Sequence, residues 1–129
     1  MKNAKYLHSE TTSKILEAFY QVYNKVGFGF EKSIYVKSLA IAMKKTGLKR
    51  GVNKELPIYF LDDEVGKIKI DIFVDNCVLV KVTNEDQIQN RDAEILQNEL
   101  RMSEIEVGLL LNFGRIPEQK RKVNLPAER

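Results

Sequence analysis

The sequence predicts a single-domain α/β protein in which two N-terminal helices precede a three-stranded antiparallel meander, a helix and a further strand that joins the sheet. Three observations lead to this prediction. Apolar residues recur at three- and four-residue spacing through the first third of the chain. The pattern then changes to the two-residue alternation of strands, which is clearest over residues 67–72. A chain of 129 residues with 43% apolar side chains is long enough for one core, and no repeat or linker divides residues 1–129.

The first two elements are predicted to be amphipathic helices with basic outer faces. The first runs over about residues 9–26, because Ser9 suits a helix start and Gly27 permits the turn that ends it. The second runs over about residues 31–46 and ends at Gly47. The residues expected to pack inward are Ile15, Leu16, Phe19, Val22, Tyr23 and Val26 in the first helix, and Ile34, Tyr35, Leu39, Ala42 and Met43 in the second.

Three β-rich runs follow, over residues 56–61, 67–74 and 77–82. Short polar turns separate them, so the three strands are predicted to form an antiparallel meander. The residues expected to make the turns are Asp62, Asp63, Glu64 and Gly66 between the first two strands, and Asp75 and Asn76 between the last two.

The remaining elements are a helix, a buried strand and a basic tail. The helix is predicted over about residues 86–101 and the strand over residues 106–113, which needs a crossover connection to rejoin the sheet. The tail, residues 115–129, contains the run Lys120-Arg121-Lys122, and its start suits a short edge strand.

The formal net charge of +3 hides a strong asymmetry along the chain. Residues 1–54 hold eleven lysines and arginines against three acids, residues 55–114 hold five against thirteen, and residues 115–129 hold five against two. Such a chain can present a basic face to nucleic-acid phosphates, or its opposite charges can meet as surface ion pairs.

Composition also bears on location. The longest uncharged apolar stretches, 77–80 and 107–111, are much shorter than the ~20 residues of a membrane-spanning helix, so no membrane role is expected. The N-terminus lacks an apolar leader, and the single Cys77 cannot form an internal disulfide. An intracellular location, in cytoplasm or nucleus, is therefore expected, with Cys77 as a small buried hydrophobe.

Several ordered motifs resemble those of the GxxExxY family, a branch of the PD-(D/E)XK nuclease superfamily. The resemblance covers about residues 8–123 and implies a restriction-endonuclease-like core. The motifs are Gly27-Phe28-Gly29-Phe30 with Ser33-Ile34-Tyr35, Ile70-Asp71-Ile72-Phe73-Val74, Val78-Leu79-Val80-Lys81-Val82, and Gly108-Leu109-Leu110-Leu111-Asn112-Phe113-Gly114 with Lys120-Arg121.

The chain departs from the family pattern at the positions that hold the metal. Lys32 stands where the family has the Glu of its name, and Lys81 and Thr83 stand where it has a Glu-x-Lys. Asp71 alone is retained. A Gln and a Tyr on the helix after the sheet correspond by position to Glu94 and Glu99.

These departures predict a degenerate site. Its set of catalytic residues is not expected to be intact, and it is expected to hold no metal ion or other cofactor. The superfamily uses Mg²⁺ held by carboxylates, and two ammonium groups in place of two carboxylates repel a divalent cation. Lys32 and Lys81 are expected to neutralise Asp71 in place of the metal, with Glu94 joining the cluster.

The expected function is therefore that of a catalytically inactive nuclease-like protein that binds nucleic acid or associates with it, because the added lysines place positive charge where phosphate and metal would meet. The residues expected to contact nucleic acid are Lys32, Lys37, Lys44, Lys45, Lys49, Arg50, Lys81, Lys120, Arg121 and Lys122.

Two alternatives remain open. One is a homodimeric protein-interaction or scaffold module with no nucleic-acid role, which would expose an apolar surface on a sheet edge or helix. The other is an active nuclease that uses Mg²⁺ or Mn²⁺ through displaced ligands. The carboxylates considered for that role are Asp71, Asp75, Glu55, Glu85 and Glu94.

Overall fold

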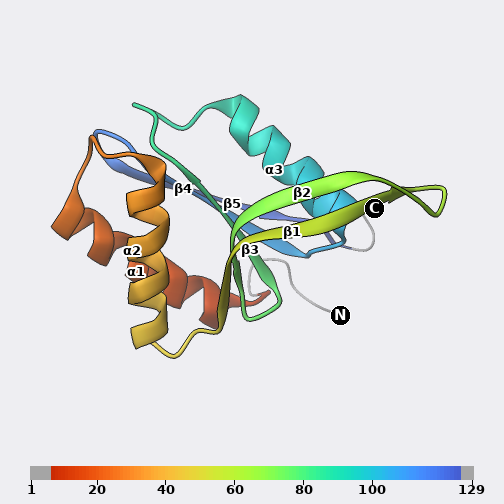
Figure 1. Cartoon of the computed structure of the whole chain (residues 1–129). Coiled ribbons are helices and arrows are strands. Elements are labelled where there is room, and N and C mark those ends of the chain that lie inside the picture. Colours follow the sequence, from red (N-terminus) through yellow and green to blue (C-terminus); the bar gives the residue numbers. More distant parts are fainter. Residues whose placement is uncertain (1–6, 126–129) are drawn as a thin grey trace.

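The structure is a computed structural model that describes residues 7–125 (Figure 1). The predicted order of elements is confirmed: two helices, three strands, a helix and two further strands. The helices are α1 (Ser9–Val26), α2 (Lys32–Lys45) and α3 (Asn90–Ser103), and the strands are β1 (Arg50–Phe60), β2 (Asp63–Val74), β3 (Val78–Thr83), β4 (Val107–Phe113) and β5 (Pro117–Val123).

The five strands form one mixed sheet in the order β1-β2-β3-β4-β5. Neighbouring strands are antiparallel except β3 and β4, which are parallel because α3 crosses over between them. The predicted antiparallel meander and the crossover are both confirmed. β5 is a seven-residue edge strand paired along the whole of β4, longer than the short strand expected there.

Helices cover both faces of the sheet (Figure 1). α1 and α2 pack on one face, against a cluster that includes Val80 and Leu109. α3 packs on the other face, against Leu79 and Leu110. Successive side chains along a strand point to opposite faces of the sheet. Leu79 and Val80 in β3, like Leu109 and Leu110 in β4, therefore pack in different clusters. Every residue of β4 is buried, as expected of a strand covered on both sides.

Tyr35 fixes the connection between α1 and α2. Its ring is fully buried and stacks on Phe113, with centroids 4.1 Å apart. Its hydroxyl donates to the carbonyl of Gly27 at 2.7 Å and accepts the backbone N–H of Phe30 at 3.1 Å. Gly27 has a φ of 75°, which a glycine adopts without strain. The start of α2, and with it Lys32, is thereby held over the sheet.

Three boundaries differ from the predictions. β1 begins at Arg50, six residues before the expected start, because its polar first half pairs with the apolar end of β2. The first turn consists of Leu61 and Asp62, both with positive φ, rather than the acidic residues after them. α3 begins four residues later than expected, at Asn90, after a non-helical segment.

Two burial predictions were also wrong. Cys77 is half-buried at the edge of the core instead of fully enclosed, and burial together with Asp75 raises the pKa of its thiol. Ile34, expected to face the core, is 37% exposed on the outer side of α2. None of the described helices is both long and apolar enough to cross a membrane.

Candidate functional site

Strands β2 and β3 separate at Asp71. The two strands pair only over Ile72–Val74 and Val78–Val80, and the earlier part of β2 continues with β1 alone as a two-stranded ribbon. At the point of separation, Oδ2 of Asp71 accepts the backbone N–H of Val82 at 2.8 Å. A side-chain carboxylate thus satisfies a donor that the β2–β3 ladder leaves without a backbone partner.

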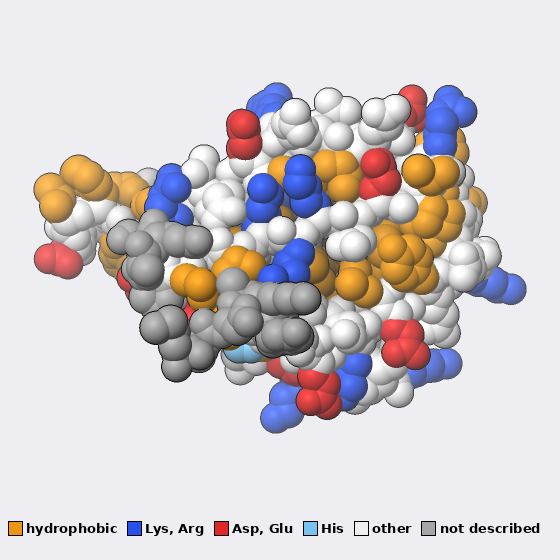
Figure 2. Space-filling model, turned by 180° about the vertical axis from the view of Figure 1, so that it is seen from behind, with side chains coloured by type: hydrophobic (Ala, Val, Ile, Leu, Met, Phe, Trp, Pro, Cys, Tyr) orange, Lys and Arg blue, Asp and Glu red, His pale blue; other side chains and the backbone are white. Residues whose placement is uncertain are grey.

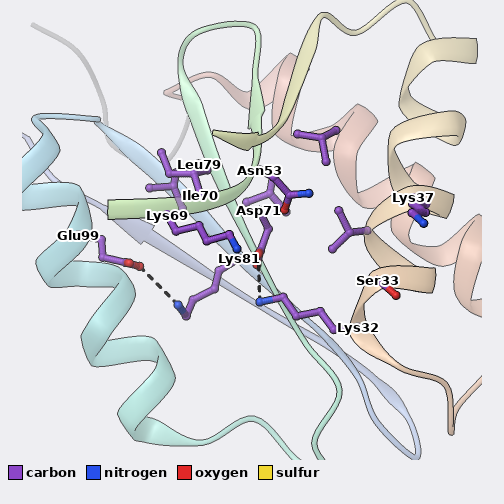
Figure 3. A pocket seen from close by; sticks show the side chains of 13 residues that line it. Lys32, Ser33, Lys37, Asn53, Lys69, Ile70, Asp71, Leu79, Lys81 and Glu99 are labelled. Atoms are coloured by element: carbon purple, nitrogen blue, oxygen red, sulfur yellow. Dashed lines mark ion pairs between the residues drawn. The ribbon is translucent and has the colours of Figure 1, made fainter. Parts of the chain in front are cut away.

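A cavity of about 460 Å³ opens at this separation (Figure 3). Its walls come from the start of α2, the β1–β2 ribbon, β3 and α3. The lining residues are Lys32, Ser33, Val36, Lys37, Val52, Asn53, Lys69, Ile70, Asp71, Leu79, Val80, Lys81 and Glu99. Four of them are lysines and only two are carboxylates, so the lining has an excess of positive charge.

Both carboxylates of the cavity are engaged by lysines. Nζ of Lys32 lies 3.0 Å from Oδ1 of Asp71, and Nζ of Lys81 lies 3.5 Å from Oε1 of Glu99. The Asp71 side chain is only 12% exposed, and the two side chains of the second pair about 20%. These pairs are therefore less screened by water than ordinary surface pairs.

The other two lysines of the cavity, Lys37 and Lys69, form no ion pair within residues 7–125. Figure 3 shows the Lys69 ammonium reaching into the space between the two ion pairs, with Lys37 at the rim on α2. The two unpaired ammonium groups give the cavity a formal charge of about +2 once each carboxylate is set against its lysine.

The N-terminus of α2 adds to this positive potential. Lys32 and Ser33 are the first two helical residues, and both line the cavity. The first turn contains no acidic residue, and the N-cap residue Glu31 makes no side-chain cap hydrogen bond. The backbone N–H groups at a helix N-terminus favour an anion, and the Glu31 carboxylate, which accepts the Ser33 hydroxyl at 3.1 Å, offsets part of this potential.

The donor set does not fit a divalent metal ion. One oxygen of Asp71 is paired with Lys32 and the other is bonded to Val82 N–H, while Glu99 is paired with Lys81. Mg²⁺ needs free carboxylate oxygens, and ammonium groups repel it. Within residues 7–125, no three His, Cys, Asp or Glu side chains gather in an arrangement that could hold a metal ion.

The residues expected to form the remnant site are only partly brought together. Lys32, Asp71 and Lys81 line the cavity, but Lys81 pairs with Glu99 and not with Asp71. Glu94 is exposed on α3 and is not among the residues that line the cavity.

Thr83 is engaged elsewhere. Its hydroxyl donates to Oδ1 of Asn112 at 2.8 Å, and Asn112 is fully buried. The same Asn112 oxygen accepts the backbone N–H of Glu85, and its Nδ2 donates to the carbonyl of Glu85. Thr83 therefore belongs to a structural network that ties the end of β3 to β4.

The carboxylates considered as displaced ligands do not meet at Asp71. Asp75 lies in the β2–β3 turn, where Oδ1 accepts the backbone N–H of Lys49 at 2.9 Å. Glu55 is exposed on β1 and Glu85 is exposed after β3. Desolvation, followed by a hydrogen bond with Asp92 and the negative charge of Asp92, raises the pKa of Glu85, which lies outside the cavity.

The basic residues expected to contact nucleic acid fall into three separate groups. Lys32, Lys37 and Lys81 line the cavity. A second group lies on α2 and the following connection, where the Arg50 Nε donates to the carbonyl of Ala40 at 2.8 Å. The third lies on β5, which β4 separates from β3. The second group comprises Lys44, Lys45, Lys49 and Arg50, and the third comprises Lys120, Arg121 and Lys122.

Lys69 is a cavity residue that the sequence did not single out, and Glu99, noted only as the counterpart of a family residue on the helix, was not expected to pair with Lys81. Lys69 could have been found from the sequence, because it lies two residues before Asp71 on one strand and strand side chains repeat their direction every second residue. The pairing of Glu99 with Lys81 depends on how α3 packs, which no local pattern encodes.

The comparisons with known proteins agree with the fold. A family profile described as the PD-(D/E)XK nuclease superfamily matches residues 9–124. The solved structure of SSO0001 is similar in fold, with a TM-score of 0.53 and 16% sequence identity over 93% of this chain. The chain spans 60% of the length of SSO0001. No curated protein sequence matches the chain.

Proposed function

Because the chain belongs to the PD-(D/E)XK nuclease superfamily, we propose that it is a catalytically inactive, GxxExxY-type member whose cavity binds the phosphate backbone of a nucleic acid. The observation that supports this proposal best is the charge of the cavity. Four lysines line it, and its two carboxylates are each already paired with a lysine.

The proposed binding is electrostatic. Lys69 and Lys37 are free to pair with phosphate oxygens, and the N-terminus of α2 offers backbone donors on one wall. Lys32 and Lys81 stay paired with Asp71 and Glu99, so that neither carboxylate repels the phosphate. Among residues 7–125, no aromatic side chain lines the cavity, so base stacking is not expected there and the binding is expected to be independent of sequence.

The test is a fluorescence-anisotropy titration of labelled DNA and RNA, single- and double-stranded, in EDTA at two salt concentrations. Binding is expected to weaken steeply with salt, because counterions are released when lysines contact phosphates. Lys69→Ala is expected to weaken binding by about 5- to 10-fold and to reduce the slope against log salt by about 1.

Lys25→Ala is the matched control, since Lys25 is an exposed lysine in the last turn of α1, outside the cavity. It is expected to leave the affinity unchanged. Failure to bind any of the four nucleic acids at low salt would overturn the proposal, as would equal effects of Lys69→Ala and Lys25→Ala.

Two metal experiments test the inactive assignment. Wild-type protein is expected to cleave neither DNA nor RNA with Mg²⁺ or Mn²⁺, and cleavage that Asp71→Ala abolishes would establish a nuclease with displaced ligands instead. In calorimetry, Lys32→Glu combined with Lys81→Glu is expected to create Mn²⁺ binding that the wild type lacks. Thr83 is left in place because its hydroxyl holds Asn112. If the double variant binds no Mn²⁺, the proposed correspondence of Lys32 and Lys81 to metal-ligand positions is wrong.

A further inference from the structure

The turn between β1 and β2 projects a cluster of apolar side chains into solvent. We call residues 59–65 the hairpin tip. Its apolar members, Tyr59, Phe60, Leu61 and Val65, are 55%, 64%, 81% and 59% exposed. Figure 2 shows this tip as an apolar group at the left end of the molecule, beyond the body of the fold. Exposed apolar clusters of this kind mark interaction surfaces.

Leu61 occupies a strained position in the hairpin tip. Phe60 pairs with Asp63, so Leu61 and Asp62 form a two-residue turn with φ values of 50° and 70°. Such turns favour Asn and Gly, because a side chain with a bulky Cβ substituent is strained at positive φ. With 81% of its surface exposed, Leu61 gains little from packing within its own chain. A residue whose backbone is strained, and whose side chain makes few contacts within its own chain to offset that strain, points to a function.

The hairpin tip is also acidic. Asp62, Asp63 and Glu64 are exposed and form no ion pair within residues 7–125. Three adjacent negative charges repel the phosphates of a nucleic acid. The partner of the tip must therefore be apolar and basic.

The outer side of α2 has this character. Ile34 and Ile41 are 37% and 61% exposed, although α2 is a helix that packs well on its inner side. Lys37, Lys44 and Lys45 are exposed and lie on the same side, because a turn takes 3.6 residues. We call this set the α2 outer face. Its two isoleucines and three lysines complement the apolar residues and three acids of the hairpin tip.

The tip cannot reach the α2 outer face of its own chain. β1 starts beside α2, where Arg50 is bonded to Ala40, and ends at the tip. An eleven-residue strand spans about 35 Å. Figure 1 accordingly shows α2 and the β1–β2 turn at opposite ends of the molecule. If a second copy is related by a two-fold axis, each tip can meet the α2 of the other copy, and two such identical contacts would close the pair.

We propose that the hairpin tip docks on the α2 outer face of a second copy, so that the chain forms a homodimer with two identical tip–helix contacts. This surface is distinct from the cavity, apart from Lys37 at the rim. The proposal does not depend on nucleic-acid binding.

The first test is the oligomeric state of the full chain by sedimentation velocity over a range of concentrations. A dimer is expected at low ionic strength, with its dissociation constant rising about 10-fold or more between about 0.05 and 0.5 M salt, because charge pairs at the rim are screened. A monomer at all concentrations in low salt would overturn the proposal.

The second test is charge exchange. Asp63→Lys with Glu64→Lys in one variant, and Lys44→Glu with Lys45→Glu in another, are each expected to abolish the dimer. An equimolar mixture is expected to form a heterodimer, because both of its contacts then join opposite charges. A control that combines Glu17→Lys with Lys25→Glu on α1 is expected to dimerise normally. Two monomeric variants whose mixture stays monomeric would show that these surfaces do not meet.

The third test separates docking from folding. Leu61→Asn is expected to abolish the dimer yet leave the thermal midpoint of the monomer unchanged or higher, because asparagine is tolerated at positive φ. A Leu61→Asn protein that still dimerises with wild-type affinity would overturn the role of the tip.

Discussion

Nζ of Lys32 lies 3.0 Å from Oδ1 of Asp71, across the gap between the start of α2 and the point where β2 leaves β3. The ammonium group therefore compensates the negative charge of a carboxylate that is only 12% exposed to water. The other oxygen of Asp71 accepts Val82 N–H, so one side chain serves both an ion pair and the sheet.

The two roles of Asp71 differ in their expected contributions to stability. Asp71→Ala leaves the buried Val82 N–H unpartnered and is expected to reduce the free energy of unfolding by about 1–3 kcal/mol. Lys32→Ala, at a side chain that is 48% exposed, is expected to cost less than about 1 kcal/mol. Urea unfolding followed by circular dichroism measures both. If both variants lose the same free energy of unfolding, the contribution of Asp71 to stability comes from its ion pair with Lys32 and not from its hydrogen bond with Val82 N–H.

Asn112 is expected to be among the most sensitive polar residues. It is fully buried and hydrogen-bonded to Thr83 and to both backbone groups of Glu85. Asn112→Ala is expected to lower the free energy of unfolding by about 2–4 kcal/mol, because it removes several hydrogen bonds at once and leaves a cavity at a fully buried position. Asn98→Ala, at an exposed residue of α3, should change it by less than about 0.5 kcal/mol. A small effect of Asn112→Ala would mean that water replaces the amide.

Gly114 is expected to tolerate no side chain. A Cβ there would lie 2.5 Å from the carbonyl oxygen of Glu85 and 2.6 Å from that of Asp86, and neither backbone atom moves freely. Gly114→Ala is expected to cost about 2–4 kcal/mol by displacing the end of β4 from the segment after β3.

Gly66→Ala is the matched control, because its Cβ would make only ordinary contacts of 3.8 Å with Ile58. It is expected to be neutral or slightly stabilising, within about 0.5 kcal/mol. Thermal unfolding of both variants tests the pair, and similar midpoints would contradict the close approach at Gly114.

Cys77 is expected to react slowly with alkylating reagents in the folded protein. Burial, and then the negative charge of Asp75, raise the pKa of its thiol, so less of the reactive thiolate is present at a given pH. The alkylation rate should therefore reach its midpoint at a higher pH in folded protein than in urea-unfolded protein. Iodoacetamide labelling followed by mass spectrometry measures both profiles. Coincident midpoints would contradict the raised pKa.

The sequence predicts the element order well because each element has a clear local period. The spacing of apolar residues in α1 and the alternation along β2 are both local signals. The first half of β1 has no such signal. Arg50 to Glu55 becomes a strand because β2 lies beside it, which is a contact between segments about twenty residues apart.

The candidate site follows the same rule. Asp71 and Lys32 were identified by comparing this sequence with the motifs of the family it resembles. Their ion pair agrees with the expectation that Lys32 neutralises Asp71. The partner of Lys81 is Glu99, and this depends on the angle at which α3 crosses the sheet. Ile34 was assigned to the core because it is apolar, but the helical turn places it beside the lysines of the α2 outer face.

The hydrogen bond between Thr83 and Asn112 bears on how this lineage can evolve. A lysine at position 83 would have to leave the buried amide without its hydroxyl partner, so the substitution lowers stability before it offers any chemistry. A substitution of Thr83 by lysine therefore requires a compensating change at Asn112, whose amide also holds the backbone of Glu85. Because positions 83 and 112 are coupled through this hydrogen bond, selection acting on one residue at a time meets a stability barrier there.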